Sequence, residues 1–304
     1  MLANTKQLLK HAQHHHYALG HFNINNLEIA QGVVQAAVNL RSPVILATSE
    51  GAIDYAGLHF LYAIAKTASE LTNIPIALHL DHGRNLDLIR QAIKIGYSSV
   101  MIDASHETFE RNIALTRKVV QLAHVKGISV EAELGTIGGV EDTVSSRHIL
   151  YTDPVMAQQF VKRTGCDFLA VAIGTSHGAY KFTGQARLRH DILRQIQQKV
   201  SIPLVLHGAS SVPPGIIRQA RQYGAELSGM EGVPPRQLQQ AISNGICKIN
   251  TDTDLRLAFD AAVRKIIQTR PQDFDPRHLL GPARDLIQKV VETHLKLFGS
   301  AGRT

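Results

Sequence analysis

The sequence predicts a closed (β/α)8 barrel, and two observations lead to that fold class. Short apolar runs rich in β-branched residues recur along the chain, and stretches of helical periodicity fill the intervals between them. This alternation is typical of βα units and of a parallel sheet. The apolar runs number eight, which favours a closed barrel over an open sheet. A length of 304 residues suits one barrel and no linker divides the chain, so residues 1–304 are expected to form a single domain.

Eight segments are predicted to be strands, because short runs of apolar residues between polar segments are typical of a buried parallel sheet. They span Tyr17–Phe22, Pro43–Thr48, Ile76–Asp81, Ser99–Asp103, Ser129–Leu134, Phe168–Ile173, Pro203–His207 and Cys247–Asn250.

Amphipathic segments separate these strands, and each is predicted to be a helix that packs its apolar face on the outside of the sheet. They span Glu28–Leu40, Leu58–Leu71, Leu86–Ile95, Glu107–Lys126, Pro154–Arg163, Ile192–Lys199 and Ile216–Tyr223.

Two segments depart from the simple alternation. Before the eighth strand, residues 226–242 (ELSGMEGVPPRQLQQAI) combine a Gly/Pro loop with a further helical stretch, which predicts an insertion over the barrel. After that strand we expect a helix over Asp254–Ile267, a loop through Pro271 and Pro276, and a terminal helix over about Ala283–Leu297. The predicted fold is therefore a barrel with an insertion before the eighth strand and a C-terminal helical extension.

The charge distribution argues against nucleic-acid binding. The formal net charge is +7 at pH 7, but Lys and Arg are scattered along the chain, and Trp is absent. No basic arm or aromatic-interleaved patch is present. A substrate that carries two phosphates would also favour a positive field around its site.

The hydropathy pattern argues against a membrane location. No apolar run approaches the roughly 18 residues that a membrane span needs, and the N-terminus has no apolar signal region. The only cysteines, Cys166 and Cys247, form no CxxC pair and are expected to be buried as small hydrophobic residues. We therefore expect a cytoplasmic protein.

Polar residues gather where the predicted strands end. In a barrel, the carboxyl ends of the strands form the active face. The segments at these ends are HLDHG (79–83), MIDASH (101–106), VEAELG (130–135), GTSHG (174–178), LHGASS (206–211) and KINTDTD (248–254). Their side chains are expected to meet at one mouth of the barrel.

Three of these segments contain a histidine followed by glycine, namely His82, His177 and His207. Three imidazoles with an open fourth position are typical of a catalytic zinc site. The alternative is that each is an ordinary hydrogen-bonded histidine, since the chain has 16 of them. Matched positions at three strand ends favour the metal site.

Acidic residues accompany the histidines. Asp81 adjoins His82 and is expected to act as a general acid/base beside the metal, although an Asp at a strand end can also cap the next helix. Asp103, Glu131, Glu133 and Glu141 form a second acidic group. These residues could hold a second cation, orient the histidines, or supply another base.

The turns GTSHG, GASS and NTDT are candidates for anion binding, because Gly- and Ser-rich turns at helix N-termini present backbone N–H groups and hydroxyls. Such turns are also common without a ligand. A phosphate site after the seventh and eighth strands is nevertheless typical of barrels.

Two longer segments, IPIALHLDHG (74–83) and VEAELGTIGGVE (130–141), resemble the signature segments of class II fructose-bisphosphate aldolases. Six further segments resemble the shorter, bacterial-type branch of that family, so the resemblance covers nearly the whole chain. They are GHFNINNLEIAQ (20–31), SPVILATSEGA (42–52), AVAIGTSHGAYK (170–181), PLVLHGASSVP (203–213), KINTDTDLRLAF (248–259) and FDPRHLLGPAR (274–284).

The resemblance implies reversible cleavage of fructose 1,6-bisphosphate to dihydroxyacetone phosphate and glyceraldehyde 3-phosphate, as in glycolysis and gluconeogenesis, through a zinc-stabilised enediolate. The implied zinc ligands are His82, His177 and His207. Asp81 would exchange the proton of the C4 hydroxyl, and Glu141 would transfer a proton at the dihydroxyacetone phosphate carbon. Asp103 and Glu133 match positions associated with a second divalent ion.

The resemblance also implies a phosphosugar pocket, often assisted by a monovalent cation (Na⁺ or K⁺), in a homodimer or homotetramer. Within it, Arg256 would bind the 6-phosphate and Asp252 would help to position the C4–C6 portion. The implied substrate-binding residues are Asn23, Ser49, Gly178, Lys181, Gly208, Ala209, Ser210, Asn250, Thr251, Asp252, Thr253 and Arg256.

Three alternatives remain open from the sequence. Tagatose 1,6-bisphosphate differs from the fructose substrate at C4, but family members that cleave it tend to lack the equivalents of Asp252 and Arg256. A Schiff-base aldolase would use Lys181 or Lys248 and would leave the three histidines unexplained. A non-enzymatic barrel that binds a sugar phosphate or nucleic acid would not need the intact pair of Asp81 and Glu141.

Overall fold

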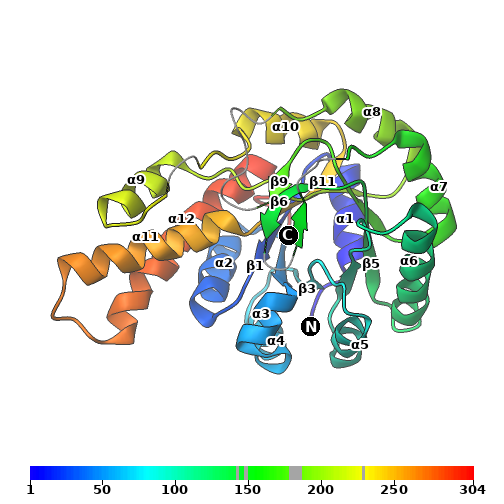
Figure 1. Ribbon diagram of the computed structural model, residues 1–304. Helices are drawn as coiled ribbons and strands as arrows, with labels where there is room; N and C mark the ends of the chain where they lie inside the picture. The colour runs from blue at the N-terminus through cyan, green and yellow to red at the C-terminus, as the bar shows by residue number, and fades with distance from the viewer. Residues whose placement is uncertain (142–143, 147–149, 178–186, 228–229) are drawn as a thin grey trace.

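Eight parallel strands close into a barrel in the computed structural model of the chain (Figure 1). The structure describes residues 1–141, 144–146, 150–177, 187–227 and 230–304, with residues 139–141, 144–146 and 177 described by their backbone alone. The strand order around the barrel is β1-β11-β10-β8-β5-β4-β3-β2, and pairing of β1 with both β11 and β2 closes it. The predicted (β/α)8, or TIM, barrel is confirmed.

Each barrel strand overlaps its predicted segment. The strands are β1 (Leu19–Asn23), β2 (Val44–Thr48), β3 (Ile76–Leu80), β4 (Ser99–Ile102), β5 (Ser129–Leu134), β8 (Phe168–Val171), β10 (Leu204–Leu206) and β11 (Ile246–Thr251).

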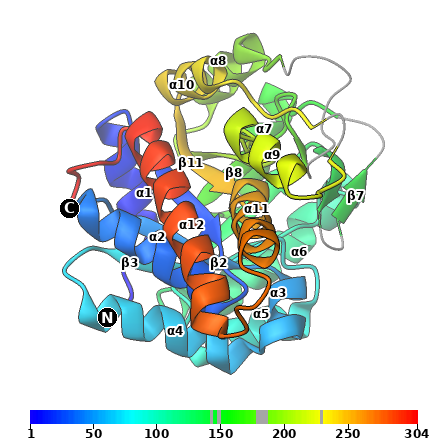
Figure 2. The same cartoon turned by 90° about the vertical axis from the view of Figure 1, so that its left-hand side faces the viewer.

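Most helices follow the strands and cover the outside of the barrel, whereas the first precedes β1 and packs against the amino end of the barrel interior (Figures 1 and 2). They are α1 (Thr5–His14), α2 (Leu27–Asn39), α3 (Glu50–Ala56), α4 (Leu58–Leu71), α5 (Leu86–Ile95), α6 (Phe109–His124), α7 (Pro154–Thr164), α8 (His190–Lys199), α9 (Pro214–Gln222), α10 (Pro235–Ser243), α11 (Thr253–Thr269) and α12 (Pro276–Phe298). The helix of the predicted insertion is confirmed as α10, and residues 228–229 before it lie outside the described residues.

The terminal helix begins earlier than predicted, at Pro276 rather than near Ala283. Proline is tolerated in the first turn of a helix, because its missing N–H would have no partner there. The side chain of Asp275 caps this helix by accepting a hydrogen bond from the backbone N–H of Arg277 at 2.9 Å. The prediction was wrong because it treated Pro276 as part of a loop.

A small second sheet at the mouth was not predicted from the sequence. It consists of β6 (Gly138–Glu141), β7 (Val144–Ser146) and β9 (Ser176–His177), with β6 between the other two. Parallel pairing of β6 with β9 places Gly139 opposite His177. The segments that follow β5 and β8 are therefore joined.

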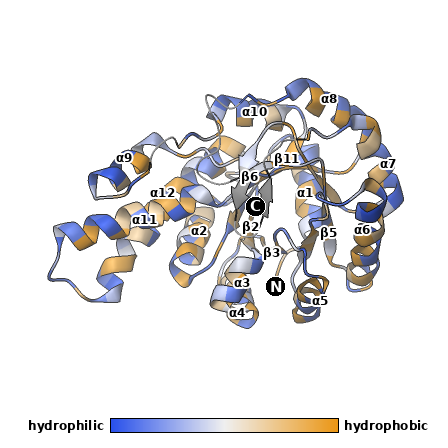
Figure 3. Cartoon of the chain, viewed as in Figure 1, coloured by the Kyte–Doolittle hydropathy of each residue, from blue (hydrophilic) through white to orange (hydrophobic). Residues whose placement is uncertain are grey.

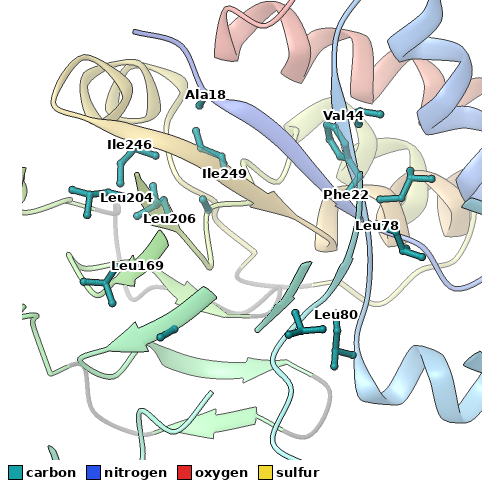
Figure 4. Close-up of a cluster of buried hydrophobic side chains, with 14 of the residues drawn as sticks. Ala18, Phe22, Val44, Leu78, Leu80, Leu169, Leu204, Leu206, Ile246 and Ile249 are labelled. Carbon is teal, nitrogen blue, oxygen red and sulfur yellow. The ribbon is translucent and has the colours of Figure 1, made fainter. Parts of the chain in front are cut away.

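Outward-facing residues of the strands pack against the inner faces of the helices to form the main core. Figure 4 shows part of this layer, with Leu204 and Leu206 of β10 beside Ile246 and Ile249 of β11. The helices carry both hydrophobic and hydrophilic residues, as expected for amphipathic helices on a barrel (Figure 3). Both cysteines are buried, and burial raises the pKa of each thiol to about 12, which agrees with their predicted packing role.

An apolar layer fills the amino end of the barrel interior, and α1 packs against it. Leu9 and Ala12 of α1 form one cluster with inward-facing residues of six strands. Those residues are Leu19, Ile45, Ala77, Phe168, Ala170, Val205 and Cys247. The backbone N–H of Ala3 also donates to the carbonyl of Ile76, the first residue of β3, at 2.8 Å. The amino end is therefore closed, and polar residues occupy the other end.

The C-terminal extension projects from one side of the barrel. Helices α11 and α12 lie side by side, α9 packs on α11, and α12 packs on α2 (Figures 1 and 2). None of the helices in the described residues combines the length and apolar composition that a membrane crossing requires.

Candidate active site

The end of β3 places Asp81 and His82 at the mouth of the barrel. His82 adopts a left-handed backbone conformation with φ of 47°, which is uncommon for any residue other than glycine. The next residue must be small, because a Cβ on Gly83 would lie 2.5 Å from the carbonyl oxygen of Met101. The carbonyl of Gly83 accepts a hydrogen bond from the backbone N–H of Asp103 at 2.8 Å. This tight contact joins the ends of β3 and β4.

His207 lies at the end of β10, fully buried and directly opposite His82. Nδ1 of His207 and Nε2 of His82 are 2.8 Å apart, and the two rings meet edge to face. A Cβ on Gly208 would lie 2.8 Å from the backbone of Ser176, so β9 passes close to His207. The backbone of His177 follows Ser176 in β9, but its side chain lies outside the described part of the structure.

In each of these two imidazoles, the ring nitrogen that faces away from the other histidine contacts a carboxylate. Nδ1 of His82 is 3.2 Å from Oδ2 of Asp103, and Nε2 of His207 is 2.6 Å from Oε1 of Glu131. Because the other nitrogens face each other, the pair has the carboxylate–histidine–metal arrangement that orients metal ligands. Ligand atoms of Asp81, His82 and His207 lie within 4.8 Å of one another and could hold a metal ion.

A second group beside the first contains His82, Asp103 and Glu133, again with ligand atoms within 4.8 Å. Oε2 of Glu133 is buried and has no hydrogen-bond partner among the described residues. Burial, followed by the charge of Asp103, raises the pKa of Glu133 to about 8. Burial alone would lower the pKa of His82, but the carboxylates around it raise that pKa to about 10. An acidic site of this kind attracts a cation.

Both carboxylate oxygens of Asp81 accept a hydrogen bond from an amide side chain. Nδ2 of Asn23 donates to Oδ2 at 2.9 Å, and Nδ2 of Asn250 donates to Oδ1 at 3.1 Å. These amides come from β1 and β11, so the orientation of the carboxylate is fixed by strands other than its own. The structure thus brings three of the predicted site residues together.

A fully buried ion pair continues from Glu131. Nζ of Lys248 donates to Oε2 of Glu131 at 2.8 Å and to Oδ1 of Asn250 at 2.9 Å. Polar contacts therefore run without a break from His207 through Glu131, Lys248 and Asn250 to Asp81. Sequence reasoning named Glu131 only as part of the acidic group and Lys248 only as a Schiff-base candidate. A paired ammonium lacks the free lone pair that a Schiff base requires.

The ends of β10 and β11 form the predicted phosphate turns. Gly208, Ala209, Ser210 and Thr251 are buried there, and Oγ1 of Thr251 has no hydrogen-bond partner among the described residues. The N-terminus of α11, which begins at Thr253, lies at the same place. Fixed N–H groups and buried hydroxyls suit a bound anion.

One residue that sequence reasoning missed holds these turns together. Asp254 accepts hydrogen bonds from the backbone N–H groups of Ser211 and Val212, at 2.9 Å and 2.7 Å. It also lies 2.8 Å from Nε2 of His294 in α12. Its place in NTDTD, two residues after Asp252, was the available signal.

The remaining predicted residues have varied positions. Arg256 forms a two-pronged ion pair with Asp252, through Nε at 3.0 Å and a terminal nitrogen at 2.6 Å. Ser49 is buried and caps α3 by accepting a hydrogen bond from the N–H of Ala52 at 3.2 Å. Gly178 and Lys181 lie outside the described residues, as does the side chain of Glu141, whose backbone is in β6.

Comparison with known proteins identifies the family of the chain. The sequence profile described as "Fructose-bisphosphate aldolase class-II" matches residues 3–303. The chain belongs to the class II fructose-bisphosphate aldolase family. It is 47% identical over 305 residues to a fructose-bisphosphate aldolase from Thermus caldophilus, covering 100% of both chains. A fructose-bisphosphate aldolase from Giardia intestinalis is also 47% identical, covering 99% of this chain and 94% of the relative. The chain is thus a class II aldolase and a lyase.

Solved structures of aldolases share the barrel. The YdjI aldolase from Escherichia coli K12 has a TM-score of 0.81 and 34% identity, covering 100% of this chain and 99% of that one. The fructose-bisphosphate aldolase from Campylobacter jejuni has a TM-score of 0.76 at 23% identity, covering 98% and 94%, and this likeness shows the fold alone.

Proposed function

We propose that this class II aldolase cleaves fructose 1,6-bisphosphate reversibly into dihydroxyacetone phosphate and glyceraldehyde 3-phosphate with a resident zinc ion. The facing imidazoles of His82 and His207, beside Asp81 and within the full-length family match, carry this proposal. The atoms that face each other are ring nitrogens, which suit zinc better than a hard cation that prefers oxygen ligands. The other nitrogen of each ring contacts a carboxylate, which orients the ring.

The proposed zinc ligands are His82, His207 and His177. A zinc ion bound there would act as a Lewis acid and stabilise the negative charge that develops on substrate oxygens. We propose Asp103 and Glu133 as the ligands of a second divalent ion, since the buried Oε2 of Glu133 has no partner among the described residues.

Asp81 is the proposed acid/base for the C4 hydroxyl. In the cleavage direction it removes that proton as the C3–C4 bond breaks and the aldehyde forms. Asn23 and Asn250 orient the carboxylate, since each donates an amide hydrogen to one of its oxygens. Glu141 is proposed to return a proton to the carbon of the dihydroxyacetone phosphate half.

The two phosphates of the substrate are proposed to contact different residues of the pocket. The turns after β10 and β11 would hold the phosphate of the dihydroxyacetone half through Gly208, Ala209, Ser210, Thr251 and Thr253, with Asn250 beside them. Ser49, Gly178 and Lys181 are proposed to contribute to the same pocket, and a monovalent cation (Na⁺ or K⁺) would assist there.

Arg256 and Asp252 support fructose bisphosphate over tagatose bisphosphate as the substrate. Their ion pair lies at the N-terminus of α11, beside the proposed phosphate turns. We propose that the Arg256 guanidinium exchanges part of this pair for the 6-phosphate, while Asp252 orients the C4–C6 portion. In this proposal, residues 1–304 act as one domain of a cytoplasmic homodimer or homotetramer that serves glycolysis or gluconeogenesis.

Metal removal tests the proposal. Treatment with EDTA should abolish fructose-bisphosphate cleavage, and Zn²⁺ or Co²⁺ should restore it, because the ligands must hold a metal for the Lewis-acid step. Cleavage would be followed by coupled detection of the triose phosphates, with metal content measured on the same samples. Activity that resists chelation and is lost on borohydride treatment with substrate would instead indicate a lysine adduct.

A further inference from the structure

Three buried polar side chains form another cluster inside the barrel, outside the proposed zinc ligands. They are His21 of β1, His79 of β3 and Asp81, and one ligand atom of each lies within 4.8 Å of the others. Nε2 of His21 is 3.9 Å from Oδ1 of Asp81, and the rings of His21 and His79 meet edge-on with centroids 5.4 Å apart. His79 precedes Asp81 by two residues and so lies deeper in the barrel.

His21 has no hydrogen bond that accounts for its burial. Its exposed fraction is 0%, yet neither ring nitrogen has a hydrogen-bond partner among the described residues. Buried polar atoms are normally paired, and an unpaired one points to a bound water or ion. His79 is similar at one end, because Nδ1 contacts Oγ of Ser99 at 2.8 Å, while Nε2 has no hydrogen-bond partner among the described residues and lies 3.6 Å from Oε2 of Glu131.

We propose that His21, His79 and Asp81 form a separate, inhibitory site for Zn²⁺ or a similar borderline metal ion. Two imidazoles, one carboxylate and an open fourth position make a typical donor set for zinc. A tetrahedral site with zinc–ligand distances of about 2.0–2.1 Å places ligand atoms about 3.4 Å apart, so the side chains need only a small inward shift. Ser99 on His79 and Asn23 on Asp81 would hold two of the ligands in orientation.

The surroundings should make metal binding at this site weaker than at the proposed catalytic site. The Lys248 ammonium lies near both His21 and His79. The same ammonium repels a cation, although its contact with Glu131 reduces this effect. The site should therefore fill only when metal is in excess.

Occupation of this site would block the proposed chemistry. Asp81 cannot accept the C4 hydroxyl proton while its carboxylate binds a metal ion. Excess zinc should therefore lower kcat and leave KM little changed, because the phosphate turns are untouched. The inhibition rests on the proposed function, whereas the uptake of the ion does not.

Metal uptake and inhibition can be compared in matched variants. Equilibrium dialysis of the zinc-loaded protein against rising free Zn²⁺, with metal measured by atomic emission, should show one more weakly held ion in the wild type than in His21→Asn. The inhibition constant of Zn²⁺ for cleavage should rise at least roughly ten-fold in His21→Asn, while turnover at low zinc is retained. His79→Asn, whose amide can keep the contact with Ser99, should behave in the same way.

His59→Asn serves as the control, because His59 is exposed on α4 and belongs to none of the metal-capable groups. This variant should match the wild type in the amount of zinc it takes up and in the inhibition constant of Zn²⁺. Equal uptake and equal inhibition in the wild type and both cluster variants would overturn the proposal, as would the absence of the extra ion in the wild type. Uptake is measured without turnover, so a chain that binds the extra ion but does not cleave fructose bisphosphate would contradict the proposed function alone.

Discussion

The carboxylate of Asp81 has an amide donor on each oxygen, which fixes its direction without help from a metal. Asp81→Ala should therefore leave zinc bound through the neighbouring His82 and its partners. Turnover should fall by roughly 10²- to 10⁴-fold, as expected when a general acid/base is lost. Steady-state cleavage rates and metal content of the purified variant measure both effects.

Asp87→Ala is a suitable control for Asp81→Ala, because Asp87 is exposed on α5 and pairs only with Arg90 among the described residues. It should cleave at the wild-type rate. The role of Asp81 is wrong if Asp81→Ala loses its metal yet recovers substantial turnover once zinc is restored.

The polar residues at strand ends could be predicted, because any residue just after a barrel strand faces the mouth. The partners of those residues could not. Glu131 contacts both His207 and Lys248 because of the register between β5, β10 and β11, and no single segment contains that register. That His21 has no hydrogen-bond partner among the described residues is likewise visible only in three dimensions.

At the scale of elements, the first turn of α11 holds the ion pair between Arg256 and Asp252. Arg256→Ala should raise KM and lower kcat/KM for fructose bisphosphate by roughly one to three orders of magnitude. That corresponds to about 1.4 to 4 kcal/mol of lost transition-state binding, because a planar guanidinium that can grip phosphate oxygens in pairs is removed. Affinity for an analogue of dihydroxyacetone phosphate, which carries only the other phosphate, should change little.

Arg264→Ala provides a matched control on the same helix. Arg264 pairs with Asp260 across one helical turn and is 41% exposed, close to the 43% of Arg256. Its removal should leave kcat/KM near the wild-type value. Equal loss of affinity for both ligands in Arg256→Ala would mean that this residue supports the first phosphate site, and a wild-type preference for tagatose bisphosphate would overturn the proposed specificity.

Long periodic elements were predictable, and short ones were not. The bounds of α4 and α5 agree with the predicted segments because their apolar faces repeat over several turns. Helix α3 has only seven residues and depends on the cap from Ser49, which sequence reasoning assigned to the substrate pocket. Strands β6 and β9 are stabilised by pairing with each other, a tertiary contact that local propensity does not encode.

For the whole molecule, the buried neutral histidines predict a loss of stability in acid. The folded-state pKa values of His21 and His79 lie well below 6.5, while both rings titrate near 6.5 once the chain unfolds. Below pH 6.5 the unfolded state therefore binds more protons, so the free energy of unfolding falls as the pH decreases. Each histidine contributes about 1.4 kcal/mol per pH unit until its folded-state pKa is reached.

Urea unfolding of the metal-free protein between about pH 7 and about pH 5 measures this slope. In His21→Asn, the slope of the free energy of unfolding with pH should be smaller by about 1.4 kcal/mol per pH unit below pH 6.5. Above pH 6.5 the slope should be the same as in the wild type. The same slope in the variant and the wild type would show that His21 becomes protonated in the folded chain.

The closed amino end has a practical consequence for handling the enzyme. Because α1 covers inward-facing residues such as Leu19 and Ala77, trimming the chain past Leu9 would expose that layer to water rather than remove a dispensable tail. A purification tag or fused protein placed ahead of Met1 would instead emerge where Ala3 meets the start of β3, on the face opposite the mouth. Fusions at this end therefore stay away from the mouth, where the proposed site residues lie, whereas deletions at the same end would uncover the apolar layer.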